Sequence, residues 1–433
     1  MPVRPFLCSC LALLACVPAA AQTRANRPER PYRGIFASGV SDLGQSLTAN
    51  TSLSGGYDDN ILADATQRNT IQASRQGMLA QFSGGLNYSL IAERGQFNAG
   101  AGTSIRYYPS LENDYFKTYN ANIAGVVRVL TKPNLTVHQS VSYQPVTFLS
   151  GLSGPGVDPG LEPLVAPEPD FVPIASQYVA YESGANLDAQ LTRRVSFLSS
   201  YTYRLSDRSE HNFWRQSGSM GFEFGLTRDL SLRTVYRYTE GHYPTRIVRT
   251  HSPDVGLDFH HALSLTRRTS LTFGAGTEAT VVNERTRYRA TGHVNVTHEI
   301  GRSWLADGSY QRGTFFIDTL AEPVFGDTGR IGVGGLITRR IQFQAAASTT
   351  IGNTGFSVQQ RRFDSYRGTV SLSTALNRFM NVGVDYAYYK YIFDPLVELE
   401  PGLPHNVNRQ SIRAHVSLWA PLMNKTRRRD ASR

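Results

Sequence analysis

Cysteine is nearly absent from this 433-residue chain, and its three copies, Cys8, Cys10 and Cys16, all lie within the first 16 residues. Beyond that point no cysteines are available for a disulfide framework or a thiolate zinc site. Charged residues are also scarce, at 18% of the chain against roughly 25% in soluble domains. With 38 Gly and 22 Tyr, this composition argues against an ordinary helical cytosolic enzyme.

Long apolar runs and catalytic motifs are missing as well. No run of 18 apolar residues occurs beyond the N-terminus, which excludes a bundle of membrane-spanning helices. The patterns G-x-S-x-G and H-E-x-x-H and a Gly-rich phosphate loop are absent, and no histidine is spaced to pair with a nucleophile. We therefore predict that the chain is not an enzyme and that it uses no cofactor and no metal.

The N-terminus carries an export pattern. Residues 1–4 supply one positive charge, residues 5–17 are apolar but too short to span a bilayer, and alanines at 19–21 form a small-residue cleavage site. This order predicts a signal peptide over residues 1–21. The alternative is a lipoprotein signal, because Leu13-Leu14-Ala15-Cys16 has the residue order used for lipidation.

From residue 46 onward, apolar and polar residues alternate in segments of about 9 to 13 residues, the pattern of a strand with one apolar face. Met78, Phe82 and Leu86 share one face of such a segment, and Gln81 and Ser83 share the other. The pattern predicts eighteen strands, at 46–57, 78–90, 96–108, 118–130, 134–145, 178–191, 195–206, 213–226, 230–240, 252–265, 269–282, 288–300, 304–316, 326–337, 341–352, 365–376, 379–391 and 408–419.

The connections between these segments alternate in length. One set is short and nearly identical, as in Leu191-Thr192-Arg193-Arg194 and Leu226-Thr227-Arg228-Asp229, and its copies recur every 35 to 39 residues. The other set is longer and rich in Gly, Pro, Asp and Asn, as at 58–77, 146–177, 353–364 and 392–407. We predict an all-β fold, a transmembrane antiparallel up-and-down β-barrel of about 18 strands (16–18), with short periplasmic turns and long extracellular loops.

The domain organisation follows from this barrel. We expect the barrel over residues 46–419, a disordered basic periplasmic leader over 22–45, and a basic periplasmic tail over 420–433. The basicity of the chain lies mainly in these two segments and in the short turns, so its formal charge of +10 does not indicate nucleic-acid binding.

Aromatic residues fall into two predicted belts, which is typical of the two membrane interfaces. Tyrosines gather toward the long loops, and Phe and Trp lie beside the short turns: Tyr57, Tyr107, Tyr143, Tyr203, Tyr238, Tyr288, Tyr310, Tyr388 and Tyr391 against Phe97, Phe197, Phe273, Trp304, Phe343, Phe379 and Trp419. We expect an outer-membrane location, with membrane lipid, lipopolysaccharide and the barrel-assembly machinery as partners. A soluble β-sandwich or β-solenoid is the alternative, but it does not explain two belts.

The polar face of such a barrel must line its lumen, because unpaired charge is costly in the hydrocarbon. It carries a basic and an acidic set, Arg106, Arg128, Arg204, Arg215, Arg233, Arg237, Arg367 and Arg413 against Glu182, Asp188, Glu223, Asp258, Glu278, Asp307 and Asp385. Eighteen strands leave a lumen too wide for side chains to fill, so we expect a water-filled channel. The alternative is a set of structural ion-pair ladders in a plugged lumen.

The segment 146–177 is the strongest candidate for a constriction. It holds six prolines, four carboxylates (Asp158, Glu162, Glu168 and Asp170) and no Lys or Arg. If it folds inward, these carboxylates would face Arg204, Arg215, Arg233 and Arg237 and create a transverse field that sorts solutes by charge. The alternative is a solvated surface loop stiffened by proline.

The opening strand runs into Gly55-Gly56-Tyr57-Asp58-Asp59-Asn60 after an export signal, and in this it resembles the beta-barrel porin type two family of Gram-negative outer membranes. The resemblance implies a porin linked to exopolysaccharide production or export, with polysaccharide-export proteins as partners. One departure is that Trp419 is followed by fourteen residues, whereas many such barrels end on an aromatic residue.

Two functions remain open on the sequence. The first is an outer-membrane channel for passive diffusion of small hydrophilic solutes. The second is a non-conducting structural or adhesive barrel that acts through its extracellular loops.

Overall fold

The computed structural model describes residues 44–61, 76–92, 94–110, 115–128, 133–145, 177–207, 212–244, 246–264, 267–282, 285–301, 303–317, 320, 322–354, 361–397 and 405–426. These residues form eighteen strands: β1 (Gly44–Asp58), β2 (Gly77–Ala92), β3 (Gly95–Tyr107), β4 (Tyr115–Arg128), β5 (Pro133–Pro145), β6 (Gln177–Gln190), β7 (Val195–Asp207), β8 (Phe213–Gly225), β9 (Leu230–Tyr243), β10 (Arg246–Ser264), β11 (Arg267–Val282), β12 (Arg285–Ile300), β13 (Trp304–Phe315), β14 (Val324–Leu336), β15 (Ile341–Thr354), β16 (Arg361–Ala375), β17 (Met380–Phe393) and β18 (Asn406–Thr426).

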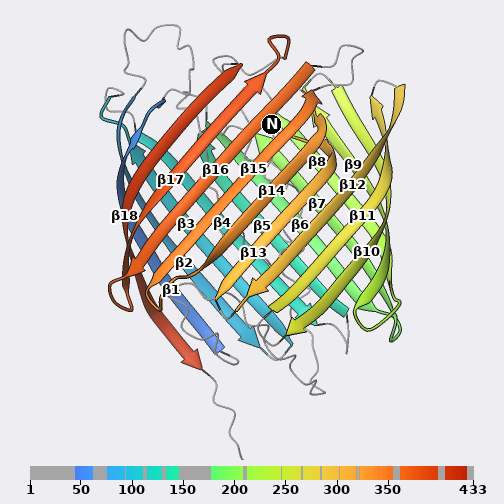
Figure 1. The fold of residues 1–433 in the computed structure, drawn as a ribbon, viewed down its shortest axis with the longest axis horizontal. Coiled ribbons are helices and arrows are strands. Elements are labelled where there is room, and N and C mark those ends of the chain that lie inside the picture. Colours follow the sequence, from blue (N-terminus) through green and yellow to red (C-terminus); the bar gives the residue numbers. More distant parts are fainter. Residues whose placement is uncertain are drawn as a thin grey trace, which may run out of the picture. The chain divides into compact units, whose positions relative to one another are not determined.

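Every strand pairs antiparallel with its neighbours in the sequence, and β18 pairs with β1 to close the barrel (Figure 1). Each of the eighteen predicted segments overlaps one observed strand, for example 195–206 against Val195–Asp207. The predicted fold class is confirmed. The strong period-two pattern makes this possible, because a slip of one residue would turn every apolar side chain of a strand inward.

The last strand is longer than predicted. β18 continues to Thr426, where it pairs with Gly44 at the start of β1, so residues 420–426 belong to the barrel and not to the predicted tail. The barrel likewise begins at Gly44, two residues earlier than predicted. The added residues of β18 pair with the start of β1, which the alternation pattern alone did not indicate.

Threonine explains the repeated short turns. In the turn after β6, the amide of Leu191 donates to the carbonyl of Val195 at 2.9 Å, and the Thr192 hydroxyl accepts from the Val195 amide at 3.1 Å. The same two bonds recur at Leu226–Leu230 and at Ile337–Ile341. These turns define the short-turn end of the barrel, and the opposite end is called the loop end below.

The loop end is less uniform than predicted. Only two residues separate β9 from β10, and only two separate β11 from β12. Long connections are therefore confined to other strand pairs.

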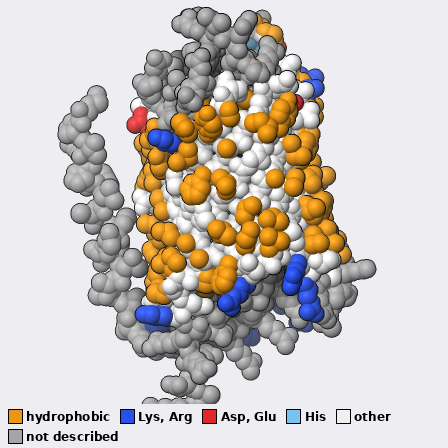
Figure 2. Space-filling model, turned by 90° about the vertical axis from the view of Figure 1, so that its left-hand side faces the viewer, with side chains coloured by type: hydrophobic (Ala, Val, Ile, Leu, Met, Phe, Trp, Pro, Cys, Tyr) orange, Lys and Arg blue, Asp and Glu red, His pale blue; other side chains and the backbone are white. Residues whose placement is uncertain are grey.

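The outer wall is apolar. Large hydrophobic side chains such as Leu53, Met78, Val255 and Ile331 are more than half exposed on it, and Figure 2 shows hydrophobic groups covering the wall, with Lys and Arg gathered at its lower, short-turn end. None of the described residues forms a helix long and apolar enough to cross a membrane. A closed sheet with an apolar outside satisfies every backbone group internally and can face hydrocarbon. The chain is an outer-membrane β-barrel.

Two predicted belt residues face the other way. Tyr391 is buried inside the barrel in a cluster with Phe363 and Phe393. Leu418 is exposed on the outer wall, so its neighbour Trp419 falls on the luminal face. Both are corrections to the predicted belts. The end of β17 with Tyr391 packs in the luminal cluster, and Trp419 lies on β18 where this strand pairs with β1 to close the barrel.

Candidate functional site in the barrel lumen

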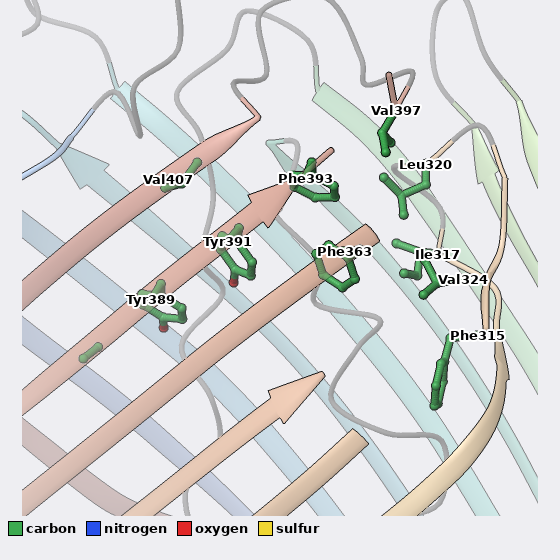
Figure 3. Packing of buried hydrophobic residues seen from close by; sticks show 11 residues of the cluster. Phe315, Ile317, Leu320, Val324, Phe363, Tyr389, Tyr391, Phe393, Val397 and Val407 are labelled. Atoms are coloured by element: carbon green, nitrogen blue, oxygen red, sulfur yellow. The ribbon is translucent and has the colours of Figure 1, made fainter. Parts of the chain in front are cut away.

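Four described residues at and after the end of β13 turn into the lumen. Phe315, Phe316, Ile317 and Leu320 are all buried. Apart from Phe316, they join one apolar cluster with Val324 at the start of β14, with residues of β16, β17 and β18, and with Val397 after β17 (Figure 3); the strand residues are Phe363, Ala387, Tyr389, Tyr391, Phe393 and Val407. Burial of apolar side chains inside a water-facing lumen stabilises this inward position.

Phe316 reaches the opposite side of the lumen. It belongs to a second buried cluster with Phe213, Tyr243, Val248 and Val282 on β8 to β11, and its ring lies 6.5 Å from that of Tyr243. The carboxylate of Glu322 forms an ion pair with Arg246 of β10 at 2.5 Å. The described residues 315–317, 320 and 322, called the inward segment below, therefore bridge two walls and narrow the lumen at the loop end.

Sequence reasoning missed the inward segment, although a signal was present. Phe315, Phe316 and Ile317 are three consecutive apolar residues, and a strand that alternates between lipid and water cannot place all three on one face. A break in alternation at the end of a strand could have indicated a segment that leaves the wall.

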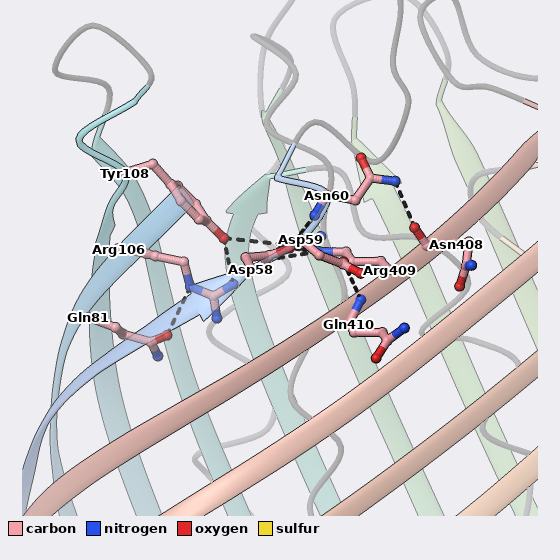
Figure 4. Close-up of polar contacts among 9 residues, drawn as sticks. All are labelled: Asp58, Asp59, Asn60, Gln81, Arg106, Tyr108, Asn408, Arg409 and Gln410. Atoms are coloured by element: carbon pink, nitrogen blue, oxygen red, sulfur yellow. Dashed lines mark hydrogen bonds and ion pairs between the residues drawn. The ribbon is translucent and has the colours of Figure 1, made fainter. Parts of the chain in front are cut away.

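A buried arginine cluster lies on the luminal side of β3 and β18. Arg409 holds the carboxylate of Asp58 through its Nε at 3.0 Å and its Nη2 at 2.5 Å (Figure 4). The hydroxyl of Tyr108 accepts from both Arg409, at 3.2 Å, and Arg106, at 3.4 Å. Arg413 lies within electrostatic reach of Arg106, Tyr108 and Asp58. Arg409 thus bonds Asp58 directly, Arg106 and Arg413 lie close by, and all four residues are less than 9% exposed.

The rest of the Tyr-Asp-Asp-Asn motif joins β1 to β18 beyond their ladder. The Asp59 carboxylate accepts from the Gln410 amide at 2.6 Å, and the Asp59 amide donates to the Gln410 carbonyl at 3.0 Å. The Asn60 side chain donates to the carbonyl of Asn408 at 2.7 Å. The motif that carried the family resemblance therefore closes the barrel seam and positions Arg409.

Gly56 makes room for this cluster. A Cβ at position 56 would lie 2.3 Å from the carbonyl oxygen of Ile412 and 2.5 Å from Cγ of Arg413. Both distances are far below a van der Waals contact, and one of the atoms is backbone. Only glycine therefore allows β18 and the stem of Arg413 to approach β1 this closely.

Gly56→Ala is expected to lower the free energy of unfolding by about 1–3 kcal/mol, the usual cost of overpacking a closed site. Gly368→Ala is the matched control, since a Cβ there meets no atom within 4 Å. Urea unfolding of both variants in detergent micelles, followed by tryptophan fluorescence, measures the difference. Equal midpoints for the two variants would contradict the packing argument.

The predicted constriction arginines lie on the luminal wall and contact wall groups. Arg204 pairs with Glu182 at 3.1 Å, and Arg215 is its cross-strand neighbour. Arg233 pairs with Asp258 at 3.3 Å and lies 2.8 Å from Nε2 of His293. Arg237 interacts with the charges of Asp254 and Glu278. Asp158, Glu162, Glu168 and Asp170 lie outside the described residues, so their inward position stays a prediction.

Other luminal ion pairs follow the predicted faces. Asp307 lies 3.9 Å from Arg330, and Asp385 lies 2.9 Å from Nδ1 of His415. In the described part of the chain, no group of three or more His, Cys, Asp or Glu is placed to hold a metal ion. The prediction that the chain is not an enzyme stays a prediction.

Comparisons with known proteins add a likeness of shape. No family model matches the chain, and no curated protein matches it. Among solved structures, it is similar to OccAB2 of Acinetobacter baumannii (8% identity, TM-score 0.45, 88% of this chain and 98% of that chain). It is also similar to OpdQ of Pseudomonas aeruginosa (11%, 0.43, 88% and 98%) and to OprD of the same organism (8%, 0.42, 89% and 98%).

These values assign neither a family nor a solute to the chain. The resemblance to the beta-barrel porin type two family is accordingly not confirmed and stays a prediction. The strand ladders themselves define the fold.

Proposed function

We propose that this protein is a porin-like channel for the passive diffusion of small hydrophilic solutes across the outer membrane. The observation that carries the proposal is a polar, charged luminal wall inside a closed barrel of eighteen strands. A barrel of this strand number encloses more space than its own side chains fill. The inward segment supplies a constriction, which sets the size of the solutes that pass.

The arginine cluster favours anionic solutes. Arg106, Arg409 and Arg413 lie close together on the luminal wall, near the carboxylate of Asp58. Field lines from such a cluster are focused by the low-dielectric wall and raise the local concentration of anions. Small carboxylates and phosphates are therefore the solute class that this wall fits best.

A second function, the non-conducting barrel, is favoured by one observation. The inward segment joins apolar clusters on opposite walls, which would reduce water passage if further segments also fill the lumen. In that case the protein would act through its extracellular loops. A link to exopolysaccharide export, with export proteins as partners and with assembly by the barrel-assembly machinery, is part of the proposal on the strength of the family resemblance.

Liposome swelling decides between the two functions. We expect vesicles that contain the purified protein to swell in small sugars and amino acids, and faster in small carboxylates. Vesicles without protein are the control for leakage. The absence of swelling by any solute would contradict the channel and favour the non-conducting barrel.

Ion selectivity in planar bilayers tests the charged groups in the same preparation. Arg413→Gln should reduce the preference for chloride over potassium, because it removes one luminal positive charge. The quadruple variant Asp158→Asn, Glu162→Asn, Glu168→Asn and Asp170→Asn should increase that preference if the acidic segment folds inward. Unchanged selectivity of the quadruple variant would remove the inward placement of that segment.

A further inference from the structure

The ladder between β12 and β13 stops part-way along both strands. Residues Gly292–Ile300 pair with Trp304–Arg312, although β12 begins at Arg285 and β13 continues to Phe315. On their other sides, β12 pairs with β11 from Arg285 onward and β13 pairs with β14 up to Phe315. The two strands therefore part at the loop end while each keeps its other neighbour.

Beyond Arg312, β13 passes to the luminal side of β12. The hydroxyl of Thr314 donates a hydrogen bond to Glu278, a luminal carboxylate of β11. The guanidinium carbon of Arg289, on β12, lies 4.3 Å from the ring centroid of Phe325 on β14. The luminal face of β12 thus covers the outward face of the β13–β14 hairpin. At this point the barrel wall is two layers of strand thick.

Side-chain contacts hold the tip of this hairpin inside. The ring of Phe316 lies over Gly241 of β9, where a Cβ would be 2.5 Å from a ring carbon. Glu322 pairs with Arg246 of β10, and Thr314 bonds to Glu278 of β11. These contacts tie Thr314, Phe316 and Glu322 to three strands with which β13 forms no ladder.

The register of the β12–β13 ladder allows a second position for the tip. If the ladder continued past Gly292 and Arg312, Ala290 would face Thr314 and Tyr288 would face Phe316. Alternation is preserved in that register, so Phe316 would join Tyr288, which is 79% exposed on the outer wall. Added backbone pairing and an aromatic pair would then replace the luminal contacts.

We infer that the tip of the β13–β14 hairpin, Gly313–Ile317, exchanges between these two positions and acts as a gate. Inside β12 it narrows the lumen, and paired with the outer part of β12 it widens the lumen. The docking partner of the exposed part of β12 is therefore a segment of this same chain. The effect on conduction rests on the proposed channel function, whereas the movement of the hairpin does not.

A cysteine pair tests the outward position. Beyond the predicted signal peptide the chain has no cysteine, so an introduced cysteine pair can form a disulfide only with itself within the barrel. Ala290→Cys with Thr314→Cys should form a disulfide under mild oxidation only if the tip moves outward, since the Thr314 hydroxyl now bonds on the luminal side of the wall. Val294→Cys with Tyr310→Cys is the matched control, because these residues already face each other in the ladder and lie four register steps away.

Crosslinking yield is read on non-reducing gels, and each variant is first checked for the heat-dependent mobility shift of a folded barrel. We expect both pairs to crosslink, and we expect the oxidised Ala290→Cys/Thr314→Cys channel to conduct roughly two-fold more than its reduced form, as a withdrawn constriction predicts. A bifunctional thiol-reactive crosslinker with a reducible disulfide spacer, placed between Gly241→Cys and Phe316→Cys, should hold conductance at the lower level.

Two results would overturn the inference. One is that the control variant crosslinks fully while the Ala290→Cys/Thr314→Cys variant does not crosslink. The other is a crosslinked outward pair with the conductance of the reduced protein. If the unmodified protein does not conduct at all, the channel proposal fails, and the crosslinking yield still decides whether the hairpin moves.

Discussion

Replacing Asp58 by alanine is expected to destabilise the barrel by about 3–5 kcal/mol, the cost of leaving a buried charge without its partner. Arg409 and Asp58 are 5% and 1% exposed at their side chains and are joined at 2.5 Å. The variant would remove the carboxylate that Nε and Nη2 of Arg409 hold and leave Arg409 close to Arg106 and Arg413. Repulsion among three guanidinium groups in a site of low dielectric adds to the loss.

The control for this prediction is an exposed pair of the same chemistry. Arg312 and Asp327 are 3.4 Å apart, with side chains 48% and 39% exposed, so Asp327→Ala should change stability by no more than about 0.5 kcal/mol. Urea unfolding in micelles measures both variants. If Asp58→Ala does not assemble, Asp58→Asn keeps the shape without the charge and is expected to fold with a reduced midpoint. An unfolding midpoint equal to that of the unmodified protein in Asp58→Ala or in Asp58→Asn would refute the role of this ion pair.

Shortening the inward segment is expected to raise single-channel conductance by roughly two-fold or more, because an eighteen-stranded barrel without a constriction is a wide pore. Residues 316–323 would be replaced by Asn-Gly. Phe315 and Val324 already face each other as the last pair of the β13–β14 ladder, so a two-residue hairpin turn can close it. The two-residue connections of β9–β10 and β11–β12 show that this rim accepts such turns.

Ile331→Ala is the matched control, since Ile331 lies on the same hairpin but is 67% exposed on the lipid-facing wall. Its conductance should equal that of the unmodified protein. Planar-bilayer recordings at one salt concentration compare the three proteins. A shortened variant that folds, as judged by its gel mobility shift, and conducts at the unmodified level would show that the segment does not limit flow.

The barrel itself was predictable because its signals are local. Alternation such as Met78, Phe82 and Leu86 against Gln81 and Ser83 depends only on residues two apart in the sequence, as the pleat of a strand requires. The Thr192 turn and its copies likewise form hydrogen bonds within five residues. Strand number, antiparallel pairing and the apolar outer wall follow from these patterns without any knowledge of distant contacts.

The arginine cluster was only half predictable. Arg106 and Arg413 fall on the luminal face by alternation, but Arg409 meets Asp58 across 351 positions of sequence. Closure of β18 onto β1 creates that contact, and no spacing rule connects the two residues. The Gly-Gly-Tyr-Asp-Asp-Asn motif was noticed for its likeness to a family, and its role in the seam became visible only with the partner strand beside it.

By itself, the sequence determined a closed antiparallel barrel with a polar lumen, because the period of the side chains and the chemistry of the short turns act over a few residues. The tertiary structure alone decided where the wall departs from that pattern: the extension of β18 along β1, the parting of β12 and β13, and the inward segment. These features depend on packing between strands far apart in sequence, where burial of Phe316 or pairing of Asp58 outweighs the local preference to continue a strand.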